Sequence, residues 1–199
     1  MLLLTTRILL LALLILLSFF IMKRTRVAGN KLCVFAVVIV CVLLASATSI
    51  FPPENAFITF RSPEAVCKYT AIGDVEAVVE GEGSACVIYR VNSHEFSSCI
   101  VPKNSNGYKI PTYFYKEKIA HTFNTFGVYT TVRAKNSNDY YIFATLPSES
   151  QELLQVFDAA GQCVETNGAL YGTAFQCICL QNFSSEYYLI INGEKIELG

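Results

Sequence analysis

The cysteines are the residues of this chain best suited to covalent chemistry. Six of the eight follow the apolar N-terminal stretch: Cys67, Cys86, Cys99, Cys163, Cys177 and Cys179. An even number of cysteines in an exported domain suggests disulfides. We expect a Cys86–Cys99 bridge first, and a second bridge that joins Cys163 to Cys177 or Cys179. The alternative is that most of these side chains are reduced and serve as small apolar residues of the core.

The Cys86–Cys99 expectation rests on the register of one hairpin. If Asn92 and Ser93 form a two-residue turn, four cross-strand pairs follow: Arg90 with Glu95, Tyr89 with Phe96, Ile88 with Ser97, and Cys86 with Cys99. Opposite charges and paired aromatic rings are favourable across strands. The two cysteine Cα atoms would then lie ~4.5 Å apart, which a disulfide accepts.

Other reactive side chains form no recognisable catalytic pattern. Cys177 and Cys179 share one face of an expected strand, so an extracytoplasmic thiol enzyme or sensor would use this pair. A redox dithiol usually lies at a helix start, however, and a zinc site needs three or four ligands at fixed spacing. His94 and His121 are the two histidines, and neither has a nucleophile and an orienting acid in a known spacing. We therefore expect no enzyme activity, no catalytic residue, no cofactor and no metal.

The chain that carries these residues has two parts of different composition. Residues 1–51 contain five basic residues and no acidic one, whereas residues 52–199 contain 10 basic and 16 acidic residues, a net charge of −6. An acidic soluble portion without a basic patch makes nucleic acid an unsuitable partner. The sequence predicts a membrane leader at 1–51 and one extracytoplasmic β-rich domain at 52–199.

The leader has two interpretations. In the first, residues 8–22 and 32–51 are transmembrane helices, and the four positive charges of the KRTRVAGNK linker place it in the cytoplasm. The hairpin is then an uncleaved signal-anchor in the cell membrane, and the C-terminal domain is extracytoplasmic. In the second, Met22 is the true start of a signal peptide that is cleaved near Ala47, and the protein is secreted.

The outer portion is predicted to be mainly β (α+β), an antiparallel sheet or sandwich with one or two short helices. Ser62-Pro63-Glu64 marks a helix start, and Gln151–Ala160 is predicted to form a second helix that ends at Gly161. Period-two apolar patterns predict eight strands: Val75–Glu80, Ser84–Val91, Glu95–Val101, Tyr108–Ile110, Gly127–Ala134, Tyr140–Leu146, Ala174–Leu180 and Tyr187–Ile191.

Two groups of side chains are expected at the surface. Glu76, Glu80 and Glu82 lie on or beside one strand and are expected to form an exposed acidic face. The aromatic runs Tyr113-Phe114-Tyr115, Tyr140-Tyr141 and Tyr187-Tyr188 alternate between sheet faces, so one ring of each should point outward. Exposed tyrosines can bind peptide or glycan; the alternative is an aromatic core with cross-strand stacking.

Several segments carry a resemblance: SPEAVCKYT, VVEGEGSACVIYRV, NGYKIP, NDYYIF and EYYLIING. Over roughly residues 60–111 and 136–195 the chain resembles small membrane-anchored or secreted β-rich envelope proteins of Gram-positive bacteria. The resemblance implies no activity, substrate or catalytic residue. We expect a non-catalytic binding or interaction role, with the lipid bilayer and an envelope protein or glycan as partners. A small structural subunit of a membrane complex is the alternative.

Overall fold

The computed structural model describes most of the chain. Its backbone is described for residues 2–24, 31–70, 73–92, 96–125, 127–146, 153–171, 175–191 and 193–198. Side chains are described for the same residues except 2–4, 6, 10, 31–33, 45, 49, 124 and 171. The fold is mainly β, with antiparallel sheets and few short helices in the β domain, which confirms the mainly β, antiparallel part of the predicted fold class.

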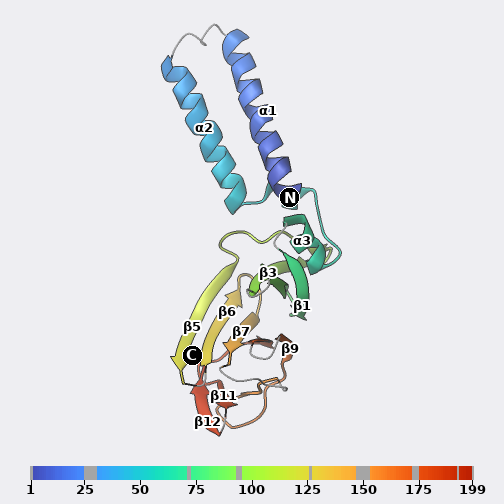
Figure 1. The fold of residues 1–199 in the computed structure, drawn as a ribbon, viewed down its shortest axis with the longest axis vertical. Helices are drawn as coiled ribbons and strands as arrows, with labels where there is room; N and C mark the ends of the chain where they lie inside the picture. Colours follow the sequence, from blue (N-terminus) through green and yellow to red (C-terminus); the bar gives the residue numbers. More distant parts are fainter. Residues whose placement is uncertain are drawn as a thin grey trace.

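The apolar N-terminal stretch forms two helices that lie side by side at one end of the molecule (Figure 1). Helix α1 covers Leu2–Arg24 and α2 covers Lys31–Ile50. The start of α1 and the end of α2 both lie next to the β domain, whereas the end of α1 and the start of α2 are remote from it (Figure 1). Within the described residues, we find no helix whose length and apolarity suffice for crossing a membrane.

A short connection joins α2 to the sheets. It contains the 3-10 helix η2 (Pro53–Ala56) and the helix α3 (Pro63–Thr70). The Ser62 Oγ atom accepts a hydrogen bond from the Ala65 N–H at 3.3 Å, as expected of an N-cap. The predicted start of this helix is therefore confirmed.

The strands of the described residues form three antiparallel sheets. In spatial order, the four-stranded sheet contains β1 (Asp74–Glu80), β2 (Ser84–Arg90), β3 (Phe96–Asn104) and β4 (Gly107–Tyr108). The five-stranded sheet contains β5 (Lys116–Asn124), β6 (Gly127–Ala134), β7 (Asp139–Thr145), β10 (Phe175–Gln181) and β9 (Asn167–Tyr171). The three-stranded sheet contains β12 (Glu194–Glu197), β11 (Tyr188–Ile191) and β8 (Val156–Phe157).

Three apolar clusters place these elements in four layers. The first lies between α3 and the four-stranded sheet and includes Val66 and Val87. The second lies between the four-stranded and five-stranded sheets and includes Ile88 and Tyr141. The third lies between the five-stranded and three-stranded sheets and includes Ile142. Because Tyr141 and Ile142 are both fully buried, the five-stranded sheet is covered on both faces.

One predicted helix is wrong. The described part of the Gln151–Ala160 segment contains strand β8, which pairs with Tyr188 and Leu189. The Leu154 N–H donates to Gln176 Oε1 at 2.8 Å, and Val156 is fully buried. Pairing with β11 therefore overrides the local helical pattern. Strands β5, β9 and β12 were not predicted.

The predicted register of the β2–β3 hairpin is also wrong, by one residue. The structure pairs Arg90 with Phe96 and Val87 with Cys99, and it places Cys86 opposite Ile100. Since neighbouring residues of a strand point to opposite faces, the shift puts Cys86 and Cys99 on different sides of the sheet. Cys86 lies in the core between the sheets, whereas Cys99 packs on the α3 side.

Candidate functional site

A buried carboxylate joins the two larger sheets. Asp139, the first residue of β7, is fully buried and lies under the turn between β1 and β2. It accepts hydrogen bonds from the N–H groups of Glu82 and Gly83, both at 3.0 Å. It also accepts from the Ser84 hydroxyl at 2.5 Å and from the Gln181 amide at 2.6 Å. Four donors satisfy a charge that would otherwise be costly to bury.

The sequence of the turn makes this arrangement possible. A Cβ atom on Gly81 would lie 2.5 Å from the Asp139 Cγ atom, and one on Gly83 would lie 2.8 Å from the Ser137 Cβ atom. Only glycine leaves room for the carboxylate to enter the turn. The two glycines of Gly81-Glu82-Gly83 are the sequence signal for this close approach, and nothing in the sequence connects them to Asp139.

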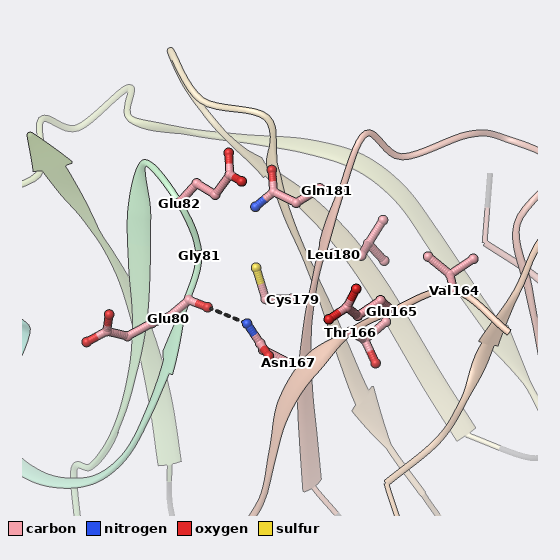
Figure 2. Close-up of a pocket in the computed structure, with 10 residues that line it drawn as sticks. All are labelled: Glu80, Gly81, Glu82, Val164, Glu165, Thr166, Asn167, Cys179, Leu180 and Gln181. Atoms are coloured by element: carbon pink, nitrogen blue, oxygen red, sulfur yellow. Dashed lines mark hydrogen bonds between the residues drawn. The ribbon is translucent and has the colours of Figure 1, made fainter.

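An open hollow lies beside this turn, between β1 and the β9–β10 edge of the five-stranded sheet (Figure 2). Its volume is about 580 Å³. Ten residues line it: Glu80, Gly81, Glu82, Val164, Glu165, Thr166, Asn167, Cys179, Leu180 and Gln181. The Asn167 amide donates to the Glu80 carbonyl oxygen at 3.4 Å and so connects the two sheets at the hollow.

The hollow carries negative charge. Glu80, Glu82 and Glu165 line it, and the Glu80 carboxylate also accepts a hydrogen bond from Lys103 Nζ at 3.2 Å. The amides of Asn167 and Gln181 add polar groups. Carboxylate and amide oxygens can accept hydrogen bonds from a cationic ligand group such as an amine. Sequence analysis identified Glu80 and Glu82 as surface acids but missed Glu165 and Asn167, because the fold alone brings them there.

Cys179 is the thiol that lines this hollow. Its side chain is 3% exposed. Burial, reinforced by the negative charge of Asp139, raises the pKa of the Cys179 thiol to about 12. The neighbouring Cys177 is fully buried in the core between the sheets. A protonated, buried thiol is a poor nucleophile, so the structure does not favour a thiol enzyme or sensor that uses this pair.

The structure brings none of the predicted disulfide partners into a bond. The seven described cysteines all carry free thiols. Cys86 and Cys99 point to opposite faces of their sheet, which removes the geometric argument for their bridge. Cys163 is exposed in the connection after β8. It therefore lies outside the core that holds Cys177 and Cys179.

His121 and Glu76 do not line the hollow. His121 is exposed on β5, and its Nδ1 atom is 2.9 Å from Thr130 Oγ1. His94 lies outside the described residues. Glu76 pairs with Arg90 at 2.6 Å. Among the residues that the structure describes, no group of three or more His, Cys, Asp or Glu side chains could hold a metal ion.

Two of the aromatic pairs are packed rather than free. Tyr140 stacks on Phe183, with ring centroids 5.4 Å apart. Tyr188 stacks on Phe157 at 5.7 Å, with the Lys195 ammonium 4.4 Å from the tyrosine ring. The outward rings of these pairs are therefore covered by neighbouring side chains.

The remaining aromatic run is different. Tyr115 is buried, and its hydroxyl donates to the Gly83 carbonyl oxygen at 3.3 Å. Tyr113 and Phe114, by contrast, are 75% and 55% exposed. Among the rings of the three aromatic runs, these two face outward most clearly.

Comparison with known protein families, with curated proteins and with solved structures finds no match to this chain.

Proposed function

We propose that the chain is a membrane-anchored protein whose β domain has a non-catalytic binding role on the extracytoplasmic side. The observation that carries the proposal is the surface of α1 and α2. Large apolar side chains are exposed on both helices, among them Leu13 and Leu16 (each 66%), Phe20 (64%), Phe35 (66%) and Leu43 (63%).

The exposed side chains surround each helix rather than forming one stripe. Phe19, Phe20 and Ile21 are consecutive and all exposed, and so are residues 42–44. Since consecutive residues of a helix are about 100° apart, no single protein surface could cover them. A helix that is apolar all round needs an apolar environment, and lipid supplies one.

The charges support an orientation for this hairpin. Lys23 and Arg24 are at the end of α1, and Lys31 begins α2, so these basic residues lie at the end that is remote from the β domain (Figure 1). Basic residues favour the cytoplasmic side. We therefore place the β domain on the opposite side, where an envelope protein or glycan would be its partner.

Within the β domain, the acidic hollow is the surface that best fits a binding role. Its volume lies within the range of ligand-binding clefts. Glu82 lies beside Gln181 in its lining, and Glu165 lies on the same segment as Asn167 (Figure 2). A partner that presents an amine or another cationic group would match this lining.

Membrane fractionation of cells that produce the full chain tests the anchor. We expect the protein to stay with the membranes after an alkaline carbonate wash, and protease added to intact cells to digest the β domain. The double variant Leu13→Glu/Leu43→Glu should be released by the wash, whereas Phe123→Glu, a matched control on β5 whose native ring is 79% exposed, should not.

Two results would contradict the proposal. One is release of the unmodified chain by the wash. The other is an intact mass that begins near Thr48, which would show cleavage near Ala47 and a secreted protein.

A further inference from the structure

Four exposed aromatic side chains lie where the two N-terminal helices meet the β domain. They are Phe51 (67% exposed), Phe57 (90%), Tyr113 (75%) and Phe114 (55%), and we call them the aromatic collar. Phe51 follows α2, Phe57 follows η2, and the other two precede β5. Side chains of this size are normally covered, so their exposure at one level of the molecule needs an explanation.

Hydrogen bonds hold the segments of the collar together. The Asn55 side chain pairs with the backbone of Ile110, donating to its carbonyl oxygen and accepting from its N–H, both at 2.8 Å. The Lys109 ammonium donates to the carbonyl oxygens of Asn55 and Ile58, also at 2.8 Å. The segment that carries Tyr113 and Phe114 is therefore fastened to the one that carries Phe57. Figure 1 shows both next to the ends of α1 and α2.

A partly buried ion pair adjoins the same segments. Arg7, near the start of α1, pairs with Glu54 of η2 at 3.2 Å, and their side chains are only 19% and 12% exposed. Beyond Arg7, the described part of α1 carries no charged residue until Lys23. The polar-to-apolar boundary of the molecule thus coincides with the aromatic collar.

We infer that the aromatic collar binds the interfacial layer of a lipid bilayer and seats the β domain against the membrane surface. The inference rests on the proposed membrane anchor. The amphipathic ring of Tyr113 favours the headgroup level, and phenylalanine rings are among the apolar side chains that interfacial surfaces bury at the boundary between headgroups and acyl chains. The collar is continuous with the apolar surface of α1 and α2, and this continuity identifies lipid as its occupant rather than a second protein.

Tryptophan fluorescence offers a direct test, because the chain contains no tryptophan. Phe57→Trp and Phe114→Trp would each place a single fluorophore in the collar of the full chain. Phe123→Trp is the matched control, since Phe123 is 79% exposed near the end of β5 that points away from the helices. Leu43→Trp reports on α2 itself. All four native side chains are exposed, so these variants should fold normally.

The variants would be reconstituted in vesicles of phosphatidylcholine and phosphatidylglycerol. A phosphatidylcholine that is brominated near the carbonyl end of its acyl chains serves as a shallow quencher. We expect roughly twofold lower emission for the two collar variants, with a shift to shorter wavelength, and no change for Phe123→Trp.

The outcomes separate the two proposals. If Leu43→Trp is quenched and both collar variants are not, the collar lies in water and the inference is overturned while the anchor stands. If the brominated lipid leaves all four variants unquenched, the anchor fails and the collar fails with it. Equal quenching of Phe57→Trp, Phe114→Trp and Phe123→Trp would indicate nonspecific adsorption and would also overturn the inference.

Discussion

At the scale of single residues, the most constrained side chain of the β domain is a charged one. Asp139 is fully buried, yet it has donors from the β1–β2 turn, from Ser84 and from Gln181. The Ser84 hydroxyl is in turn 2.9 Å from the Tyr141 hydroxyl. This network fixes the four-stranded sheet relative to β7 and β10, and with it one wall of the hollow.

We expect Asp139→Asn to lower the free energy of unfolding by about 3 kcal/mol. The amide would place a donor where backbone N–H groups of Glu82 and Gly83 already donate. Urea unfolding of the full chain in a mild detergent measures the change. Asp158→Asn is the control, because Asp158 accepts one bond from Gln162 N–H in a surface turn. It should cost less than about 1 kcal/mol. Equal stabilities for the two variants would show that the network is not required.

Buried thiols make the domain sensitive to alkali. Burial raises the pKa of Cys67 and Cys179 to about 12 and that of Cys99 to about 11, from an ordinary value of 9.0. Above pH 9 the unfolded chain releases these protons while the folded chain keeps them. The contribution of these thiols to the free energy of unfolding should therefore be steady below pH 9 and fall above it by about 1.4 kcal/mol per thiol and pH unit, up to about pH 11 for Cys99 and about pH 12 for Cys67 and Cys179.

Unfolding by urea at a series of pH values measures this slope. Cys67→Ala should reduce the slope of the free energy of unfolding against pH by the contribution of one thiol. Cys163→Ala should leave it unchanged, because Cys163 is exposed in the folded chain as well. A slope that both variants leave intact would mean that other groups cause the alkaline loss.

At the scale of elements, the sequence predicted most strands but not how they pair. Gly127–Ala134 was predicted with both of its ends correct, because it is rich in β-branched and aromatic residues and begins at a glycine. The β2–β3 register failed because Arg90 pairs with Phe96 rather than Glu95, so five residues instead of four separate the last paired positions. An error of one residue in the length of a turn moves every side chain of the following strand to the opposite face of the sheet. The Cys86–Cys99 prediction depended on that turn.

The hollow could not be predicted from the sequence, for a related reason. Its walls come from β1, from β10, and from Glu165 and Asn167, which lie in or just before β9. Strand β9 was not predicted, since Asn167-Gly168 begins it and glycine weakens a strand pattern. Segments that are distant in sequence meet there only through sheet pairing, which local periodicity does not encode.

The glycine at the start of β6 allows the backbones of β6 and β7 to approach closely. Gly127 has a φ of 142°, and a Cβ atom there would lie 2.3 Å from the Thr145 carbonyl oxygen. We expect Gly127→Ala to lower the free energy of unfolding by about 3 kcal/mol, through both strain and displacement of β7. Gly193→Ala is the matched control, because φ is 82° there and nothing lies within 4 Å. It should cost about 1 kcal/mol, for backbone strain alone. Similar urea midpoints for the two would contradict a close approach at Gly127.

At the scale of the whole molecule, one ion pair joins the helices to the β domain. Arg7 lies on α1 and Glu54 on η2, and Arg7 donates from both Nε and Nη2 to the carboxylate. Both side chains are largely buried, so water screens this pair less than an exposed one. The pair also places the start of α1 beside the connection that leaves α2. Residues near the N-terminus therefore help to set the position of a domain that begins some 45 positions later.

The charges of Arg7 and Glu54 should keep the 3-10 helix η2 closed at this junction. Arg7→Glu would place two carboxylates together, and we expect η2 to open more often as a result. The N–H groups of Phe57 and Ile58 donate to the Glu54 carbonyl oxygen at 3.0 and 2.7 Å, so hydrogen exchange at these two amides reports the opening. A loss of about 1.4 kcal/mol would speed their exchange about tenfold.

The reversed pair Arg7→Glu/Glu54→Arg separates charge from packing. It restores opposite charges in the same place, so exchange at Phe57 and Ile58 should return close to the original rate. Lys195→Glu is the control for a general charge effect, because Lys195 and Glu197 are an exposed pair at 3.9 Å. It should leave exchange at the junction unchanged. If the reversed pair exchanges as fast as Arg7→Glu alone, the attraction between Arg7 and Glu54 does not hold the junction, and the apolar contacts of α1 with its neighbours must do so instead.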